Sequence, residues 1–313
     1  MVTAVGEGLS APVALTGATG FVGQAVVDEA QRRGEPVRAL TRRKSAPREG
    51  VEWLAGTLDD EEALDRLCAK AAAVVHVAGL TTSHDPAAFA AANVEGTRRL
   101  IAAAKARRVR RFVFVSSLSA REPGLSAYGA SKAEAEALVE DSGLDWVIVR
   151  PPGVYGPRDV DYFEMFRSAR LGFIPLPPRG ASSLIHVDDL ARLLLDLVDA
   201  PEALVRHSIF EPDDGREGGW SHRELAQAIG AATGRRVFAP HLPAGVMRLA
   251  ARADRLVRGR RARLTEDRVS YMVHPNWVAR TSLRVPPALW QPRIDTQQGL
   301  RDTARWYRRE GWL

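Results

Sequence analysis

One short stretch near the start of the chain, residues 13–23 (VALTGATGFVG), constrains the fold more than any other. Four residues of strand character, Val13 to Thr16, lead straight into a turn with glycines at three-residue intervals. An amphipathic run follows from Phe21 to Arg33. The pattern predicts a strand, a tight turn and a helix whose apolar stripe consists of Phe21, Val22, Ala25, Val26 and Ala30.

The same turn predicts a binding site for an anion. The unpaired N–H groups at the start of the helix, together with the positive end of its dipole, suit a pyrophosphate. Two glycines would let the backbone approach the phosphates, and the third would let the helix lie close to the strand. The spacing G-x-x-G-x-x-G differs from the G-x-G-x-x-G of the dehydrogenase fingerprint, so a turn that only reverses the chain is the alternative. We expect cofactor contacts from Gly17, Thr19, Gly20, Phe21, Val22 and Gly23.

The bulk composition excludes several classes of protein. At 313 residues the chain can bury a full core and has room for a second, small lobe. No apolar run approaches the ~18 residues of a membrane-spanning helix. The single cysteine, Cys68, cannot form an internal disulfide, and the seven histidines are scattered, so we expect no metal site. We expect a reducing, cytoplasmic location, because no basic region precedes an apolar stretch at the N-terminus.

The net charge of +6 is unevenly distributed. Forty of the 44 cations are arginine, and nine of these lie between Arg235 and Arg263, where Asp254 is the only acid. Nucleic-acid binding would need aromatic side chains among the charges, and this stretch has only Phe238. We therefore expect no nucleic-acid partner.

Part of this arginine-rich stretch, residues 243–258, has the period of an amphipathic helix. We interpret it as a helix that caps the fold and shows its arginine side to solvent. Docking on anionic lipid or on an acidic partner is the alternative. The apolar stripe is Val246, Leu249, Ala250, Ala253, Leu256 and Val257, and the arginines opposite are Arg248, Arg252, Arg255 and Arg258.

Short apolar strands alternate with helical runs through the first 200 residues. This order predicts a doubly wound α/β fold with a parallel sheet that is buried on both faces. His76 lies within one of the apolar strands, so we expect it to be structural. The expected strands include Val37–Leu40, Ala73–Val77 and Phe112–Val115, and the expected helices include Asp59–Ala69 and Pro86–Ala104.

The end of the second strand bears on the choice of cofactor. In dinucleotide-binding folds an acid at this point binds the free ribose hydroxyls, whereas arginine favours a 2′-phosphate. Here the sequence is Thr41-Arg42-Arg43-Lys44, with no acid. It favours NADP over NAD, and a solvent-exposed basic turn is the alternative.

Candidate catalytic residues follow the strand that ends at Val115. Ser116 and Ser117 lie at a carboxyl edge, where open α/β sheets place their ligands. Eleven residues beyond Ser117 comes Tyr128-Gly-Ala-Ser-Lys132, at the start of a helical stretch. Residues at i and i+4 share a helix face, so Lys132 is expected beside Tyr128. A cation there would lower the tyrosine pKa and make the phenol a usable acid–base.

Seven segments, in this order along the chain, resemble the extended short-chain dehydrogenase/reductase family of the NAD(P)-dependent epimerase/dehydratase type. They cover residues from about 12 to 200. The segments are Thr16-Gly-Ala-Thr-Gly-Phe-Val-Gly23, Val75-His-Val-Ala-Gly79, Asn93-Val-Glu-Gly-Thr97, Phe114-Val-Ser-Ser117, Tyr128-Gly-Ala-Ser-Lys132, Arg150-Pro-Pro-Gly-Val-Tyr-Gly-Pro157 and His186-Val-Asp-Asp189.

The resemblance implies a Rossmann fold and a nicotinamide cofactor, with NADP(H) favoured and NAD(H) open. It implies that Tyr128 is the catalytic acid–base, that Lys132 binds the nicotinamide ribose and that Ser117 binds the substrate oxygen. Ser116 and Ser119 are fallback candidates for the serine. Besides the glycine turn, Arg42, Tyr128 and Lys132, we expect cofactor contacts at Leu58, Ala78, Gly79, Pro151, Gly153 and Val154.

Three departures from the family pattern bear on the substrate and the cofactor. Thr57 replaces an acid that often holds the adenine amine, which leaves adenine contact to the backbone around Leu58. The segment 118–127 between serine and tyrosine is short. Residues 182–186 lack the arginine that sugar-nucleotide members place there, and the approach to them is the apolar run 173–178. These features weaken a UDP-sugar assignment and favour a less charged carbonyl or alcohol.

We therefore expect an NAD(P)-dependent oxidoreductase that transfers a hydride between the nicotinamide and a carbonyl or alcohol. A sugar-nucleotide epimerase or dehydratase with a tightly held cofactor is the first alternative. A non-catalytic nucleotide-bound subunit, similar to the accessory subunit of respiratory complex I, is the second. The expected domains are a dinucleotide-binding domain over 1–200 and a substrate-capping lobe over 201–313. The expected partner is a small-molecule substrate, and a homodimer is left open.

Overall fold

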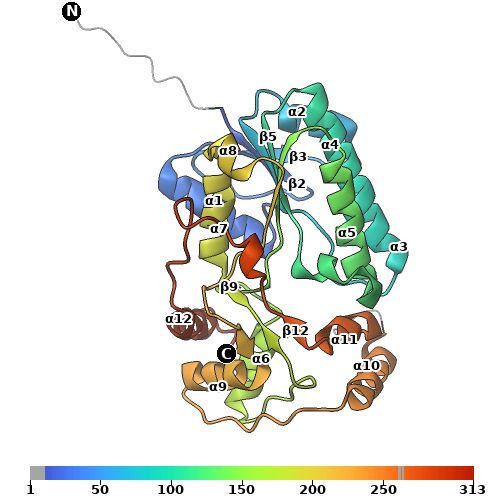
Figure 1. Ribbon diagram of the computed structural model, residues 1–313, viewed down its shortest axis with the longest axis vertical. Coiled ribbons are helices and arrows are strands. Elements are labelled where there is room, and N and C mark those ends of the chain that lie inside the picture. The colour runs from blue at the N-terminus through green and yellow to red at the C-terminus, as the bar shows by residue number, and fades with distance from the viewer. Residues whose placement is uncertain (1–10, 260–261, 263) are drawn as a thin grey trace, which may run out of the picture.

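The structure, a computed structural model, describes residues 11–259, 262 and 264–313. Its centre is a sheet of seven parallel strands in the order β10-β6-β5-β4-β1-β2-β3 (Figure 1). The order reverses direction at β1, so the predicted doubly wound α/β fold is confirmed. The strands are β1 Val13–Thr16, β2 Val37–Thr41, β3 Val51–Ala55, β4 Ala73–His76, β5 Arg111–Val115, β6 Asp145–Val149 and β10 Ser208–Phe210.

Helices cover both faces of this sheet because its strands are apolar on both sides. Val13 and Leu15 of β1 belong to one buried cluster, while Ala14 between them belongs to the other. On the first face α1 (Phe21–Arg33) packs beside α7 (Val187–Asp199). The second face is covered by α2 (Glu61–Cys68), α4 (Gly96–Ala106) and α5 (Ala127–Glu140).

The helix expected over 86–104 contains a change of pitch. It begins as α3 (Pro86–Phe89), passes through a π-helical segment (Ala90–Glu95) and continues as α4. The π segment places Asn93 in the interior, where it is buried. Such wide turns often occur at functional sites.

A second lobe lies beyond the carboxyl ends of the strands, at the bottom of Figure 1. Its core is formed by α6 (Phe163–Arg170), α9 (His222–Thr233) and α12 (Thr296–Arg309). Elements from both sides of residue 200 build this lobe, and β10 after residue 200 belongs to the main sheet. The remaining elements are β7 Gly153–Tyr155, β8 Ala181–Ser182, β9 Leu184–His186, β11 Trp220–Ser221, β12 Asn276–Trp277, α8 Glu202–Val205, α10 Ala244–Arg258, α11 Glu266–Met272 and the 3₁₀ turns Leu118–Arg121, Pro123–Leu125 and Thr281–Leu283.

The helix predicted over 243–258 exists as α10, but its packing differs from the prediction. Its contacts with the lobe are made through Met247 and Ala251, which are buried against Val269 of α11. The stripe that was expected to face the lobe is exposed instead, with Leu256 87% exposed. The interpretation of a cap helix that shows only its arginine side is therefore wrong. Arg260, Arg261 and Arg263 lie outside the described residues.

Among the described residues, no helix combines the length and the apolarity needed to cross a bilayer.

Candidate active site

The glycine turn between β1 and α1 leaves no room for side chains. Gly17 has φ +75°, and a Cβ there would lie 2.6 Å from the backbone nitrogen of Ala78 at the end of β4. A Cβ at Gly23 would lie 2.0 Å from the carbonyl oxygen of Gly17. The N–H of Gly20 donates to Gly17 within the turn, and the hydrogen-bond ladder of α1 begins with the N–H of Gln24 donating to Gly20, so the amides of residues 21–23 precede the ladder.

This turn fits the pyrophosphate of a dinucleotide. The first turn of α1 contains no acidic residue that would repel an anion. Thr19 and Gly20 are exposed at its tip, while Phe21 and Val22 are partly buried. The cradle that was predicted from Gly17 to Gly23 is therefore open to a ligand on the side where the helix dipole is positive.

His76 fixes the end of β4 beside this turn, and its hydrogen bonds define its tautomer. The Thr97 hydroxyl donates to the Asn93 carbonyl (2.6 Å), so it accepts from His76 Nε2 (2.9 Å). Nδ1 then accepts from the Thr16 hydroxyl (2.7 Å), which itself accepts from the N–H of Ala78 (3.2 Å). Burial lowers the pKa of His76 to about 3. The ring is neutral and orients the Ala78 backbone, as expected for a structural histidine.

Asn93 connects the loop after β4 to the tyrosine helix. Its side-chain oxygen accepts from the N–H of Leu80 (2.7 Å), and its nitrogen donates to the Leu80 carbonyl (3.0 Å). The same nitrogen donates to the Ser131 hydroxyl (2.9 Å), which donates to the carbonyl of Tyr128 (2.8 Å). The sequence pattern Asn93-Val-Glu-Gly-Thr97 marked this residue, but its positioning role was not predicted.

The predicted serine and tyrosine meet at the carboxyl end of β5. Ser117 precedes a 3₁₀ turn and its hydroxyl accepts from the N–H of Ser119 (3.2 Å). Burial raises the pKa of Tyr128 to about 12, and a hydrogen bond with the Ser117 hydroxyl opposes that rise. The hydroxyl of Ser116 is buried and, among the described residues, has no hydrogen-bond partner. Geometry thus pairs Tyr128 with Ser117 and not with Ser116.

Lys132 lies one turn beyond the tyrosine but contacts a different group. Its ammonium donates to the carbonyl of Val115 (2.7 Å) and lies 4.4 Å from the ring centroid of Phe114. Burial lowers the pKa of Lys132 to about 8, against the opposing charge of Glu136. The prediction that Lys132 lowers the pKa of Tyr128 is wrong, because burial raises that pKa and the group that opposes the rise is Ser117.

The remaining predicted cofactor residues surround the same sheet edge. Gly79 follows β4, and a Cβ there would lie 3.8 Å from the Lys132 ammonium. Pro151 follows β6 and accepts from the N–H of Leu118 (3.1 Å). A Cβ at Gly153 would lie 2.1 Å from the Tyr162 hydroxyl, so a larger residue there would displace Tyr162. Val154 lies in β7, paired with β9.

The far end of the expected cofactor site lies after β2 and β3. Arg42 and Arg43 are exposed, and no ion-pair partner for either occurs in the part of the chain that the structure describes. Leu58 packs close to α4, where a Cβ at Gly96 would lie 2.7 Å from it. This leaves two free guanidinium groups at the position where a 2′-phosphate is expected.

The lobe contributes side chains to the tyrosine that sequence patterns did not identify. Burial is the main cause of the raised pKa of Tyr128, and the charges of Tyr271 and Asp161 raise that pKa further. Arg268 pairs with Asp161 (2.8 Å) and hydrogen-bonds Tyr271. Residues 161, 268 and 271 are separated in sequence and carry no motif, so only the fold brings them together.

A series of buried ion pairs connects the elements that carry the site residues. Arg150 forms two hydrogen bonds with Glu136 of α5 (2.9 and 2.5 Å) and lies 3.8 Å from Glu211. Glu211 also pairs with Arg121 (3.2 Å), which follows Ser117 in the next turn. These pairs tie the serine loop, the tyrosine helix and the end of β10 into one rigid unit.

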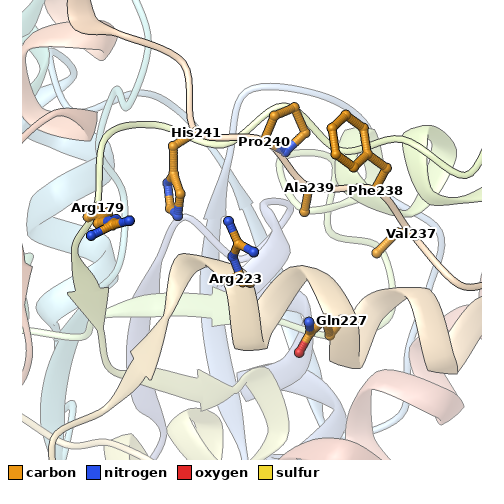
Figure 2. A pocket seen from close by; sticks show the side chains of 8 residues that line it. All are labelled: Arg179, Arg223, Gln227, Val237, Phe238, Ala239, Pro240 and His241. Atoms are coloured by element: carbon orange, nitrogen blue, oxygen red, sulfur yellow. The ribbon is translucent and has the colours of Figure 1, made fainter.

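A separate hollow of about 430 Å³ lies on the second lobe, between α9 and residues 237–241. Figure 2 shows Arg223 and Gln227 on α9 facing this segment, with Arg179 and His241 at one side. None of the predicted catalytic or cofactor residues lines it. We do not assign this hollow to the catalytic site.

The parallel sheet, the glycine cradle and the Ser–Tyr–Lys arrangement at one edge define a dinucleotide-binding enzyme of the short-chain dehydrogenase/reductase type. The chain belongs to the NAD dependent epimerase/dehydratase family, whose model matches residues 13–211. The predicted family and the predicted enzyme class are both confirmed.

Curated relatives include reductases that match nearly the whole chain. A ceramide reductase from Caulobacter vibrioides is 33% identical over 316 residues, which cover 96% of each protein. A 2-alkyl-3-oxoalkanoate reductase from Stenotrophomonas maltophilia is 29% identical and covers 92% of this chain and 97% of its own length. Among solved structures, MoeE5 in complex with UDP-glucose and NAD has a TM-score of 0.74 at 22% identity, covering 96% of this chain and 99% of its own. That last similarity concerns the fold.

Proposed function

We propose that the protein is an NADP(H)-dependent reductase that converts a ketone on a long-chain lipid into an alcohol. The observation that carries this proposal is the 33% identity to a ceramide reductase over 96% of both chains, which extends beyond the residues 13–211 that the family model matches. The second full-length relative is also named for a ketone beside alkyl chains.

Local chemistry supports an uncharged substrate. Residues 182–186 lack the arginine that sugar-nucleotide enzymes place there. The buried hydroxyl of Ser183 in this segment donates to Asp213 (2.8 Å). It therefore offers no charge to a substrate diphosphate. The ring of Phe89 lies 6.0 Å from that of Tyr128, so the phenol has an apolar neighbour on the side of α3.

The residues present fit a bound NADP and suggest a division of labour. The turn from Gly17 to Gly23 would hold the pyrophosphate, Arg42 the 2′-phosphate and Lys132 the nicotinamide ribose. When bound, the cofactor supplies the hydride. Tyr128 is neutral below its pKa of about 12 and can donate its proton to the carbonyl oxygen as negative charge develops there. Ser117 would hold that oxygen by a second hydrogen bond.

The test is the reduction of a long-chain 3-oxo lipid in detergent with NADPH. The loss of nicotinamide absorbance measures the rate. Tyr128→Phe removes one hydroxyl and should lower turnover by about 10²- to 10⁴-fold, because the proton donor is lost. Tyr155→Phe is the matched control, since it removes a buried hydroxyl that hydrogen-bonds Thr296 in the lobe. Turnover of Tyr128→Phe at the wild-type rate, or absence of activity on any long-chain ketone, would contradict the proposal.

The cofactor preference is tested separately by titrating NADPH and NADH. Loss of charge-assisted contacts to the 2′-phosphate costs about 1.5–3 kcal/mol, or roughly 10- to 150-fold in affinity. The Arg42→Ala/Arg43→Ala variant should lose this much for NADPH and almost nothing for NADH. Arg301→Ala, an exposed change on α12, should leave both affinities unaltered. Equal wild-type affinities for the two cofactors would refute the NADP assignment.

A further inference from the structure

Helix α10 carries an apolar stripe that faces solvent. Leu249 is 67% exposed, Leu256 87% and Val257 84%, and Val246 lies on the same side. In the described part of the chain, these four are among ten large apolar side chains with such exposure. Four on one helix of 15 residues form a continuous patch and not scattered single residues.

The contacts of α10 with the lobe lie on its other side. Met247 and Ala251 are buried, and together with Val269 they form a small cluster that is separate from the three main cores. Asp254 also points toward this side, where it accepts from the N–H of Leu264 (3.1 Å). Among the described residues, the packing of α10 therefore does not involve the exposed stripe.

Positive charge lies along one border of the stripe. With 3.6 residues per turn, Arg248, Arg252 and Arg255 fall between the packed side and the apolar side. Arg252 pairs with Glu266 of α11 (2.8 Å), whose pKa is lowered by its hydrogen bond and ion pair with Arg252 and further by the charges of Arg255 and Arg248. One carboxylate faces three guanidinium groups, so this border keeps a net positive charge.

An exposed apolar stripe bordered by arginines is the pattern of a helix that lies in a membrane interface. We propose that α10 docks on the surface of an anionic lipid bilayer. The leucines and valines of the stripe enter the boundary between headgroups and acyl chains, and the arginines contact anionic headgroups.

Docking at α10 bears on substrate access, a consequence that rests on the proposed function. α10 packs on α11, and Asp267 of α11 accepts from the N–H of Ala127 (2.6 Å) at the start of the tyrosine helix. α11 also contacts the 3₁₀ turn Pro123–Leu125, which leads into that helix. The helix that would touch the bilayer therefore packs on the element that borders the catalytic tyrosine, which suits a substrate drawn from lipid.

The experiment is co-sedimentation of the full chain with vesicles of phosphatidylglycerol and phosphatidylcholine in equal parts, and with phosphatidylcholine alone. Wild type should bind the anionic vesicles in low salt and dissociate near 0.5 M salt, where the screening length is about 4 Å. Arg248→Gln/Arg255→Gln should weaken binding about 25-fold, or roughly fivefold per arginine. Leu249→Gln/Leu256→Gln should weaken it by at least about tenfold.

The matched control is Leu204→Gln, which alters an exposed leucine on α8, at the opposite end of the molecule from α10 (Figure 1). It should bind vesicles as wild type does. No binding of wild type in low salt would overturn the proposal, as would equal binding by the leucine variant. A dimer in sedimentation velocity that the leucine variant dissociates, without vesicle binding, would also overturn it and assign the stripe to self-association.

Reductase activity on a short, water-soluble ketone is measured in the same samples without vesicles. Retained activity without vesicle binding contradicts docking and leaves the proposed function intact. Vesicle binding without activity on any ketone supports docking and contradicts the proposed function. Circular dichroism of each variant excludes loss of the fold as the cause.

Discussion

Helices α1 and α10 have the same kind of sequence pattern and opposite surroundings. Each has an apolar stripe at helical spacing and arginines elsewhere on its surface. In α1 the stripe packs between the main sheet and α7; Ala25, Val26 and Ala30 are buried there, and Val26 is fully inaccessible to solvent. In α10 the stripe faces outward, and Val257 is 84% exposed.

The difference teaches that periodicity predicts a helix but not which of its faces is covered. Burial needs a partner of sufficient size. α1 packs on the main sheet and on the 13-residue α7, whereas α10 packs on the seven-residue α11, against which it buries Met247 and Ala251. An apolar face without such a partner is left for another molecule or a membrane.

Replacing one glycine in each helix by alanine should give the largest contrast in the free energy of unfolding. Gly23 and Gly245 both lie in the first turn of their helix. Gly23→Ala should destabilise the protein by about 3 kcal/mol and abolish cofactor binding, because its Cβ would lie 2.0 Å from the Gly17 carbonyl oxygen. Gly245→Ala meets no atom within 4 Å and should stabilise α10 by up to about 1 kcal/mol.

Urea unfolding of both variants, with fluorescence titration of NADPH, gives these values. A Gly23→Ala protein that is as stable as wild type would show that the turn is not close-packed. A destabilising Gly245→Ala would show that the start of α10 is covered by something other than solvent.

The sequence predicted the core of the protein well because local and global preferences agree there. Strand–turn–helix patterns, the tyrosine–lysine spacing and the serine at a strand end all belong to single segments. The contact of Asp267 with the start of the tyrosine helix could not be predicted, because it comes from a helix 140 residues away along the chain. The hydrogen bond of Lys132 to Val115 was missed because spacing places a side chain on a face but does not choose its acceptor.

Buried charge provides a second contrast between the core and α10. The core buries Lys132, and burial lowers its pKa to about 8, whereas the arginines of α10 stay in contact with solvent. A lysine whose folded pKa lies below its unfolded value of about 10.4 destabilises the fold while both states are protonated. That penalty is full below pH 8 and is relieved as the pH rises toward 10.

Between pH 8 and pH 10 the free energy of unfolding of wild type should rise by about 2 kcal/mol relative to that of Lys132→Met. Comparing the two proteins cancels the effect of groups that titrate in both. One such group is Cys68, whose pKa burial raises to about 12. Lys105→Met, at an exposed position on α4, is the matched control and should show no such slope. A flat difference for Lys132→Met would mean that the ammonium is hydrated in solution.

The smallest effects come from a matched pair of valines and bear most directly on the comparison. Val26→Ala in α1 deletes two buried methyl groups and should cost about 2 kcal/mol, since transfer and cavity terms add. Val257→Ala in α10 deletes the same groups from an exposed position and should change the free energy of unfolding by less than about 0.5 kcal/mol. Urea unfolding in dilute solution measures both. A cost above 1 kcal/mol for Val257→Ala would show that the stripe is covered in solution, and dependence of that cost on protein concentration would identify a second copy as the cover.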